Sequence, residues 1–292
     1  MTGAITVRSG SAQAIVEPSF GGRITSLRLA GREWLQQAAV PLVPAHPFDD
    51  FVRPDIGGWD EMLPTCVPVT FDGVGLPDHG DVWSATWDVV DAGADHVELA
   101  VDCRTVPVRV VRRLGVTGAA TGDTVRLDYT VTNVGESPAP GFWMAHPLLD
   151  ATDLVDVTFE PADVEWHRTI ADPHPPADKH ERAPHLLPHS LTPGGYRKYR
   201  ATAPVAAAAL HARDGAELRI AWDLPVPVHV QLWVDNAGIG GVPVIAVEPA
   251  TAAGDDPVAA RAAGALPTLQ PGDTMRFTVR LSGRPGPGSM PP

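Results

Sequence analysis

The sequence predicts an all-β protein, built as a large antiparallel β-sandwich. Segments with the alternating pattern of a half-buried strand recur along the chain, and strand follows strand without a regular helical pattern in between. The chain also contains 31 prolines and 28 glycines, which leave few windows for a helix longer than about three turns. Because α/β folds place a helix between successive strands, these observations favour a sandwich of antiparallel sheets.

The clearest strand is the segment "TVRLDYTVTNVG", where apolar Val125, Leu127, Tyr129 and Val131 alternate with polar residues. Eight further segments show a similar strand pattern, mostly bounded by Gly, Pro, Asp or Asn: 12–18, 23–31, 95–103, 106–116, 216–224, 228–235, 243–249 and 274–282. No internal repeat or shift in composition marks a domain boundary. We therefore expect one domain over residues 1–283 and a disordered tail over 284–292.

Two segments depart from the strand pattern. The proline-rich segment "PHPPADKHERAPHLLPHS" (173–190) is expected to form a long surface loop. A short helix is predicted from Pro257 to Ala263, with Asp255 or Asp256 as its N-cap and the proline at its first position.

Charge and composition exclude several classes of partner. The formal net charge of −13 argues against a nucleic acid or an anionic membrane surface, because both require basic patches. No apolar run approaches the ~20 residues that span a bilayer, and the N-terminus lacks the pattern of a signal peptide. We therefore expect a cytoplasmic protein, a monomer or homodimer, whose Cys66 and Cys103 are buried thiols and not a disulfide.

Two residues at strand ends are candidates for acid–base chemistry. Glu248 ends the apolar strand 243–248 and precedes a proline, so its carboxylate is either a partly sheltered base or a surface group at a turn. His146 lies among apolar residues before Pro147, where an imidazole is more often a hydrogen-bonded core residue than a catalyst.

A third group combines aromatic side chains with acids, the combination that suits the faces and hydroxyls of a sugar ring. The alternative is that the tryptophans are core residues, which we prefer for Trp87. The group occurs in the segments "IGGWDEMLPT" and "GLPDHGDVW" and comprises Trp59, Asp60, Glu61, Asp78, His79 and Trp83.

No cofactor or metal is predicted. His174, His180, His185 and His189 have no spacing typical of metal ligands, and the intervening prolines would hold their imidazoles apart. Gly-rich phosphate loops, nucleophile elbows and HExxH motifs are absent from the sequence.

Taken in their order along the chain, the sequence motifs resemble those of the aldose 1-epimerases, the galactose mutarotase-like superfamily. The similarity runs from about residue 4 to 283. It rests on the ordered segments "PSFGGRITSLRLAGREWL", "PDHGDVW", "TNVGESPAPGFWMAHPLLD", "VIAVEPATAAGDD" and "LQPGDTMRFTVRL".

The resemblance implies a large antiparallel β-supersandwich with an open cleft for a small-molecule sugar. It assigns Glu248 as general base, His146 as general acid and His79 as a second histidine at the reacting ring. Interconversion of α and β anomers by ring opening needs neither a metal nor a redox cofactor. The residues expected to bind the sugar are Asp78, Trp59, Glu61, Trp83, Asp60, Trp233 and Arg53, and Asp223 and Asp235 are alternatives for a further sugar-binding aspartate.

The sequence also departs from its relatives. Many of them carry an arginine shortly after His-Gly, whereas this chain has Asp81 and Trp83, where we expect its choice of substrate to be determined. A neutral sugar is therefore favoured over a sugar phosphate, although Arg23 or Arg53 could replace the missing arginine. Two other classes stay open. One is a carbohydrate-binding protein without turnover. The other is a lyase or hydrolase on the same scaffold, which the missing helical domain and the missing signal peptide disfavour.

Overall fold

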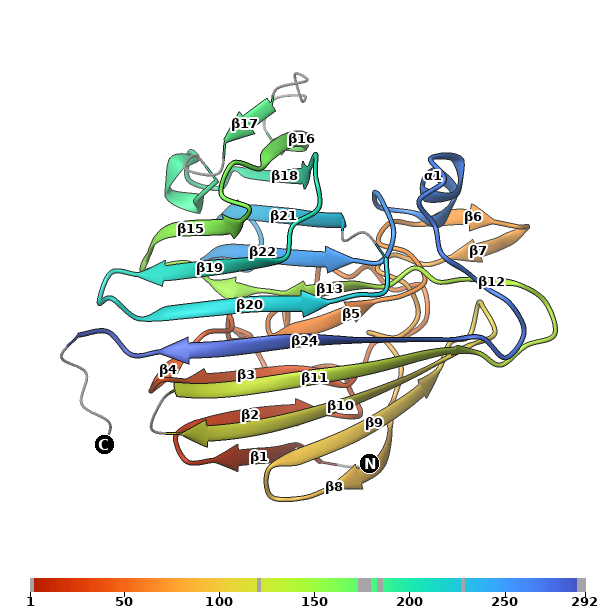
Figure 1. Ribbon diagram of the computed structural model, residues 1–292, viewed down its shortest axis with the longest axis horizontal. Coiled ribbons are helices and arrows are strands. Elements are labelled where there is room, and N and C mark those ends of the chain that lie inside the picture. Colours follow the sequence, from red (N-terminus) through yellow and green to blue (C-terminus); the bar gives the residue numbers. More distant parts are fainter. Residues whose placement is uncertain (1–2, 120–121, 173–179, 183–185, 227–228, 288–292) are drawn as a thin grey trace.

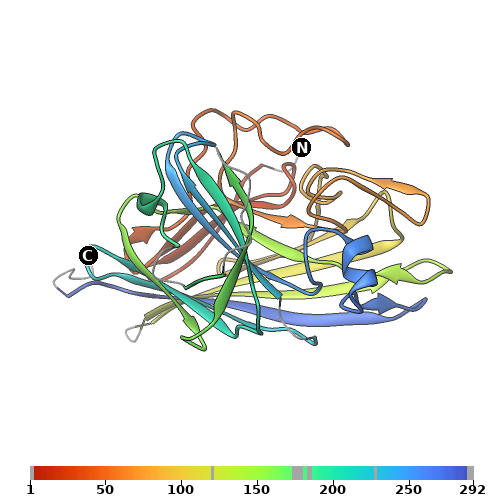
Figure 2. The ribbon, with the colours of Figure 1, turned by 90° about the horizontal axis from the view of Figure 1, so that it is seen from above.

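The computed structural model describes residues 3–119, 122–172, 180–182, 186–226 and 229–287. The regular secondary structure of the described part is almost entirely antiparallel strand, as the sequence predicts, and two large sheets pack face to face (Figures 1 and 2). The one α-helix of this part is α1 (Pro257–Ala262), and Asp256 is its N-cap, with a side chain that accepts from the Ala259 amide. No helix among the described residues is long and apolar enough to cross a membrane.

The first sheet carries the candidate site. In order across the sheet, its strands are β1 (Ile5–Ser9), β2 (Ala12–Glu17), β3 (Arg23–Leu29), β5 (Trp59–Met62), β13 (Met144–Pro147), β22 (Pro243–Ala250), β21 (His229–Asn236), β18 (Tyr196–Ala201), β16 (Glu165–Asp172) and β17 (His180–Arg182), with β4 (Arg32–Glu33) beside β3 and β14 (Leu149–Asp150) beside β22.

The second sheet supports the first. Its strands, in order, are β15 (Leu154–Glu160), β19 (Ala207–Ala212), β20 (Glu217–Asp223), β24 (Thr274–Arg284), β11 (Gly122–Asn133), β10 (Val108–Ala119), β9 (His96–Asp102) and β8 (Asp88–Ala92). Two small two-stranded sheets complete the described strands: the hairpin of β6 (Val69–Phe71) with β7 (Val74–Leu76), and β12 (Ala139–Pro140) paired with the distant β23 (Thr268–Leu269).

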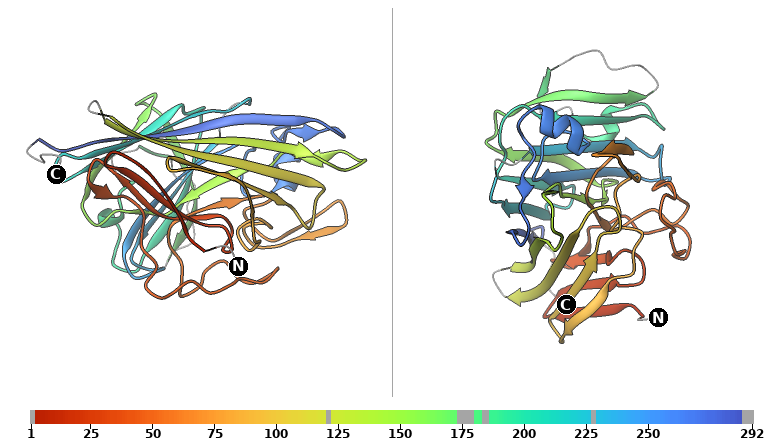
Figure 3. Two further views of the ribbon diagram at one scale, coloured as in Figure 1. Left: turned by 90° about the horizontal axis from the view of Figure 1, so that it is seen from below. Right: turned by 90° about the vertical axis from the view of Figure 1, so that its right-hand side faces the viewer.

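The core lies between the two sheets, and alternation decides which side chains enter it. On β11, Val125, Leu127, Tyr129 and Val131 are buried as the sequence predicts. Strands β1–β3 lie against β10, β11 and β24 of the second sheet (Figure 3). The opposite face of the first sheet is covered by the segment 37–55, the β6–β7 pair and α1, which arch over it in Figure 2.

The proline-rich segment differs from the predicted loop. Residues 180–182 form β17, paired with β16, and Leu186 and Leu187 are buried in the core. Residues 173–179 and 183–185, with His174 and His185, lie outside the described part, as do residues 288–292 of the predicted tail. Strand β24 continues to Arg284, whose guanidinium contacts Glu217 at 2.7 Å.

Candidate active site

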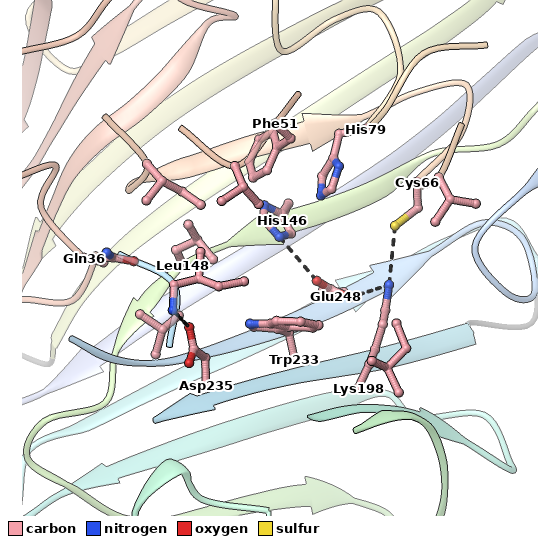
Figure 4. Close-up of a pocket in the computed structure, with 16 residues that line it drawn as sticks. Gln36, Phe51, Cys66, His79, His146, Leu148, Lys198, Trp233, Asp235 and Glu248 are labelled. Carbon is pink, nitrogen blue, oxygen red and sulfur yellow. Dashed lines mark hydrogen bonds and ion pairs between the residues drawn. The ribbon is translucent and has the colours of Figure 1, made fainter. Parts of the chain in front are cut away.

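A cavity opens on the face of the first sheet that points away from the second sheet. Ile245 and Val247 of β22 belong to the core between the sheets, so alternation turns Val244, Ala246 and Glu248 to the other face. The space that the cavity encloses, counted together with the open solvent at its mouth, is about 690 Å³. Its described lining comprises Gln36, Phe51, Val52, Ile56, Cys66, Val67, His79, His146, Leu148, Ile170, Lys198, Trp233, Asp235, Ile239, Val244 and Glu248 (Figure 4).

Glu248 and His146 meet because their strands are neighbours. Strands β13 and β22 are antiparallel with Met144 opposite Ala250, and two residues further this register places His146 opposite Glu248. The imidazole Nε2 lies 3.6 Å from the Glu248 Oε1 (Figure 4), and both side chains are buried. The surface alternative for Glu248 is therefore excluded.

Glu248 is a buried carboxylate with spare capacity for hydrogen bonds. Its Oε2 has no hydrogen-bond partner among the described residues, and the nearest cation is the Lys198 Nζ at 3.8 Å. Burial raises the pKa of Glu248 to about 7, with the Lys198 charge opposing the shift and Asp255 adding to it. A carboxylate of this kind is a competent proton acceptor near neutral pH.

Lys198 was not predicted from the sequence, yet it stands beside the carboxylate. Its Nζ donates to the Asp255 Oδ1 at 2.7 Å and to the Cys66 Sγ at 3.3 Å. Burial alone would lower the pKa of Lys198, but the negative charge of its neighbours outweighs burial and raises it, so the side chain stays an ammonium. The Asp255 loop is itself fixed, because its carbonyl accepts from the amides of Cys66 and Val67.

His79 is placed by a tight turn after β7. Its backbone lies in the left-handed region at φ 55°, and its amide donates to the Cys66 carbonyl at 3.0 Å. The next residue, Gly80, has φ 76°, and a Cβ there would lie 2.1 Å from the Leu63 carbonyl oxygen. The glycine of the Asp-His-Gly sequence is therefore a steric requirement for docking this turn against residues 63–66.

Two side chains hold the His79 ring. Its Nδ1 lies 2.9 Å from the Asp78 Oδ1, and Phe51 stacks on the imidazole with 3.9 Å between ring centroids. The second oxygen of Asp78 accepts from the Phe51 amide at 3.0 Å, which ties the two contacts together. Although burial opposes ionisation, the hydrogen bond and charge of His79 lower the pKa of Asp78 below its usual value.

His146 has a different environment. Its ring meets His79 and Phe51 edge-on, at 5.2 and 4.9 Å between centroids, and its buried Nδ1 has no partner among the described residues. Burial first, and then the charges of His79 and Lys198, lower the pKa of His146 well below the ordinary value. His146 is therefore a neutral imidazole, whereas His79 has a carboxylate beside it.

The far end of the cavity is formed around Trp233. This residue lies opposite Ala246 on β22 and stacks on Tyr196, with 5.0 Å between ring centroids. Two residues further along β21, Asp235 accepts from the amides of Gly238 and Ile239 at 2.7 and 2.8 Å, so it fixes the loop that follows this strand. Burial raises the pKa of Asp235.

Strand β5 carries three predicted sugar-binding residues, and none of them lines the cavity. Trp59 is fully buried in the core. Asp60 lies opposite His146 in register but binds the Arg23 Nε at 3.1 Å beneath the histidines. Glu61 points between the sheets, so these placements correct the expectation that the acids of this segment face a sugar.

Glu61 is held by a complete set of partners from the second sheet and the core. Its Oε1 accepts from the Arg112 guanidinium at 3.1 Å and from the Tyr129 hydroxyl at 2.7 Å, and its Oε2 accepts from the Trp143 indole at 2.9 Å. Both members of the Glu61–Arg112 ion pair are buried. This carboxylate therefore joins the two sheets.

Three further predicted residues support the site from outside the cavity. Trp83 packs edge-on against Phe51, and its indole donates to the Asp78 carbonyl at 2.9 Å. Arg53 binds Asp49 and Asp55, so it fixes the segment 43–55. Asp78 orients His79, as described above. Of the seven residues expected to bind the sugar, only Trp233 lines the cavity directly, and of the two alternative aspartates Asp235 lines it and Asp223 does not.

Asp81, where we expected substrate choice to be determined, has a structural contact instead. Its Oδ2 accepts from the amides of Arg104 and Thr105 at 2.9 and 2.8 Å and from the Thr105 hydroxyl at 2.7 Å. The side chain is buried, and it connects the His79 turn to the loop before β10.

Sequence reasoning missed Phe51, Lys198, Cys66 and Gln36, and it left Asp235 as one of two alternatives. Lys198 stands in "YRKYR", where polar side chains on both faces of the strand hide the buried lysine. Both cysteines are free thiols, as expected, Cys66 buried and Cys103 half-buried, and burial raises the pKa of Cys66 to about 12. The described residues hold no group of three metal-ligating side chains, but His174 and His185 lie outside them.

The fold matches several solved structures at low sequence identity. A protein of Escherichia coli K12 that is provisionally named an aldose 1-epimerase superposes with a TM-score of 0.71 at 19% identity, over 96% of this chain and 98% of that one. A galactose mutarotase-like protein of Lactobacillus casei gives 0.68 at 18% identity, over 97% and 100%. A galactose mutarotase related enzyme of Lactobacillus acidophilus gives 0.70 at 12% identity, over 98% of both chains.

No protein-family model matches the chain, and no curated protein matches it in sequence. The structural matches confirm the galactose mutarotase-like, all-β fold that the sequence motifs predicted.

Proposed function

We propose that this chain, which has the galactose mutarotase-like fold, is an isomerase that interconverts the α and β anomers of a neutral aldose. One observation carries the proposal: Glu248 is buried at a cavity beside two histidines, with a pKa of about 7 and one oxygen that accepts no hydrogen bond from the described residues. Pure binding of a sugar does not require a proton acceptor and proton donors at one point, whereas ring opening does.

The base step falls to Glu248. Its carboxylate takes the proton of the anomeric hydroxyl, and the electron pair of that O–H bond forms the C1 carbonyl. The bond between C1 and the ring oxygen breaks, and the ring oxygen keeps that electron pair and receives a proton. The open aldehyde rotates about its C1–C2 bond, and closure in the reverse sense delivers the other anomer.

We assign the proton donor for the ring oxygen to His79, where the family resemblance had pointed to His146. The carboxylate of Asp78 accepts from the Nδ1 of His79, so in the doubly protonated ring the Nε2–H is left to give its proton to the ring oxygen. Ring closure returns this proton to Nε2. His146 is neutral because of its burial, so it is suited to donate or accept a hydrogen bond and to orient Glu248.

Lys198 acts through Glu248 and not on the sugar ring. Its ammonium, 3.8 Å from the Glu248 Oε2, favours the ionised carboxylate that the base step requires. The ion pair with Asp255 keeps the ammonium in place. Lys198 is therefore a positioning residue.

Exchange spectroscopy by NMR tests the proposal, since it measures α/β interconversion directly. The protein should equilibrate at least one aldose of a panel faster than buffer, and Glu248→Gln should abolish the acceleration while the sugar still binds. A protein that binds sugars but never accelerates exchange, with Glu248→Gln binding unchanged, would be a carbohydrate-binding protein instead.

A further inference from the structure

One row of side chains crosses three neighbouring strands of the first sheet, β22, β13 and β5, which follow one another in Figure 1. The register of these strands places Glu248 opposite His146, and His146 opposite Asp60, so the three side chains point to the same face of the sheet. The imidazole of His146 therefore stands between two carboxylates, of which Glu248 lines the cavity and Asp60 does not.

Each member of this row has a buried polar atom that makes no hydrogen bond within the described part of the chain. The three atoms are the Glu248 Oε2, the His146 Nδ1 and the Asp60 Oδ2. Such atoms are uncommon in folded proteins, because burial removes the hydrogen bonds that they would make with water. Three of them in one row beside a cavity indicate a chemical role.

Arg23 favours the ionised form of Asp60. The Asp60 Oδ1 accepts from the Arg23 Nε at 3.1 Å, and both side chains are buried. Burial raises the pKa of Asp60, but the charges of Arg23, His79 and Arg112 oppose this shift. An ionised carboxylate only accepts hydrogen bonds, so its second oxygen requires a donor, and the opposing His146 has an unpartnered ring nitrogen to offer.

His146 is neutral, so it carries one proton, on either of its two ring nitrogens. The titratable and charged groups that face it come from five elements: Glu248 on β22, Asp60 on β5, His79 in its turn, Lys198 on β18 and Arg23 on β3. Its Nε2 lies 3.6 Å from the Glu248 Oε1, which is longer than an N–H···O hydrogen bond. This distance fits a nitrogen that does not donate to Glu248, and it leaves the proton to Nδ1.

We propose that Asp60 is a positioning residue, which holds the proton of neutral His146 on Nδ1 and leaves Nε2 as an acceptor facing Glu248. The Cβ atoms of directly opposite residues are about 4.5–5.5 Å apart, a span that a small rotation of the carboxylate or one water molecule bridges.

The consequence concerns the base, so this role rests on the proposed function. Ionised Glu248 receives no hydrogen bond from Nε2, whereas its protonated form can donate its O–H to that nitrogen. Both effects favour the protonated form, so Asp60 makes Glu248 a stronger base for the anomeric proton.

A nitrogen-15 spectrum of the imidazoles tests the assignment, because protonated and unprotonated ring nitrogens resonate at separate positions. The protein carries labelled histidine and is measured at pH 8, and the His146 signals are identified by their loss in His146→Gln. We expect the proton on Nδ1 in the wild type and on Nε2 in Asp60→Asn, whose new amide donates to Nδ1. Asp123→Asn, the same change at a buried aspartate that accepts from Ser11 and the Ala30 amide, should keep the wild-type tautomer.

Exchange kinetics give a second readout on the folded variant. In Asp60→Asn the Nε2–H donates to ionised Glu248, so the rise of the rate with pH should move downward by about one unit. The kcat for anomer exchange should fall by about tenfold, whereas KM should stay within about twofold, because Asp60 does not line the cavity. A merely structural role for Asp60 would move neither the tautomer nor the pH profile.

The outcomes keep the two proposals apart. A wild-type His146 with its proton on Nε2, or a tautomer that Asp60→Asn leaves unchanged, would overturn the role of Asp60 and keep the isomerase. If no aldose exchanges faster than buffer, the isomerase proposal fails, and the tautomers still decide whether Asp60 positions His146. If Asp60→Asn does not fold, the wild-type spectrum decides alone: a proton on Nδ1 upholds the role, and one on Nε2 refutes it.

Discussion

Glu61 and Glu248 are both buried glutamates of the same sheet, but they point into different regions of the molecule. Glu61 faces the core between the sheets, where Arg112, Tyr129 and Trp143 use both of its oxygens. Glu248 faces the cavity, where one of its oxygens accepts no hydrogen bond from the part of the chain that the structure describes, and burial raises its pKa to about 7. A carboxylate with every hydrogen bond supplied by the protein stabilises the fold, whereas one left incomplete at a cavity is available to a ligand.

The largest effect expected from this difference is on turnover. Glu248→Gln removes the base while it keeps the shape of the side chain, so kcat/KM for anomer exchange should fall by about 10³-fold. Exchange NMR with the best aldose of the panel measures this loss. A variant that retains more than about a tenth of the activity would remove Glu248 from the base role.

The same variant should not lose stability, and its pH dependence is diagnostic. Between the ordinary glutamate value of 4.5 and about 7, the folded protein holds a proton that the unfolded chain has released. The wild type therefore loses stability with rising pH across this window, and Glu248→Gln does not. Urea unfolding at pH 5 and pH 8 gives the free energy of unfolding of both proteins. If this free energy changes equally with pH in wild type and in Glu248→Gln, the raised pKa is contradicted.

The reciprocal change at Glu61 should act on stability. Glu61→Gln leaves the buried Arg112 guanidinium without its counter-charge, so the free energy of unfolding should fall by about 3 kcal/mol. Chemical denaturation of the two Gln variants, side by side, provides the matched comparison. Loss of turnover in Glu61→Gln without loss of stability would break the distinction between the two carboxylates.

The sequence predicts the strands well because their alternation is set by burial on one face. Strand β5 escapes this prediction, since all four of its residues are buried and two of them are acidic. In such a strand a shift of one residue exchanges the faces, so the sequence alone could not tell that Glu61 points to the core and Asp60 beneath the histidines.

The candidate site was predictable only where a motif marks a backbone requirement. Asp-His-Gly and His-Pro locate His79 and His146, and Glu-Pro locates Glu248. The predicted strand end at Glu248 is wrong, however, because β22 continues through the proline to Ala250. Lys198 and Phe51 have no such mark, because their roles arise from strands and loops that meet only in the fold.

Lys198 sharpens the comparison. Its ammonium lies 3.8 Å from Glu248, whereas Arg112 donates a hydrogen bond of 3.1 Å to Glu61. The rate should rise with pH through about 7 as Glu248 ionises. In Lys198→Met the opposing charge is gone, so this rise should move upward by about one pH unit, with some loss of stability from the unpaired Asp255. Lys198→Arg is the control that keeps the charge, and a Met variant whose pH profile is unmoved would deny Lys198 its positioning role.

The smallest effect is expected at Asp81, a third buried carboxylate. It tests whether three hydrogen bonds from the protein to one oxygen are enough to identify a structural role. Asp81→Asn weakens three hydrogen bonds to residues 104–105, so unfolding should require about 1–2 kcal/mol less. The relative kcat/KM values for different aldoses should stay within about twofold of wild type, because the side chain does not reach the cavity. A changed preference among sugars, measured on the folded variant, would contradict this structural role. It would show that Asp81 influences specificity through the turn that carries His79.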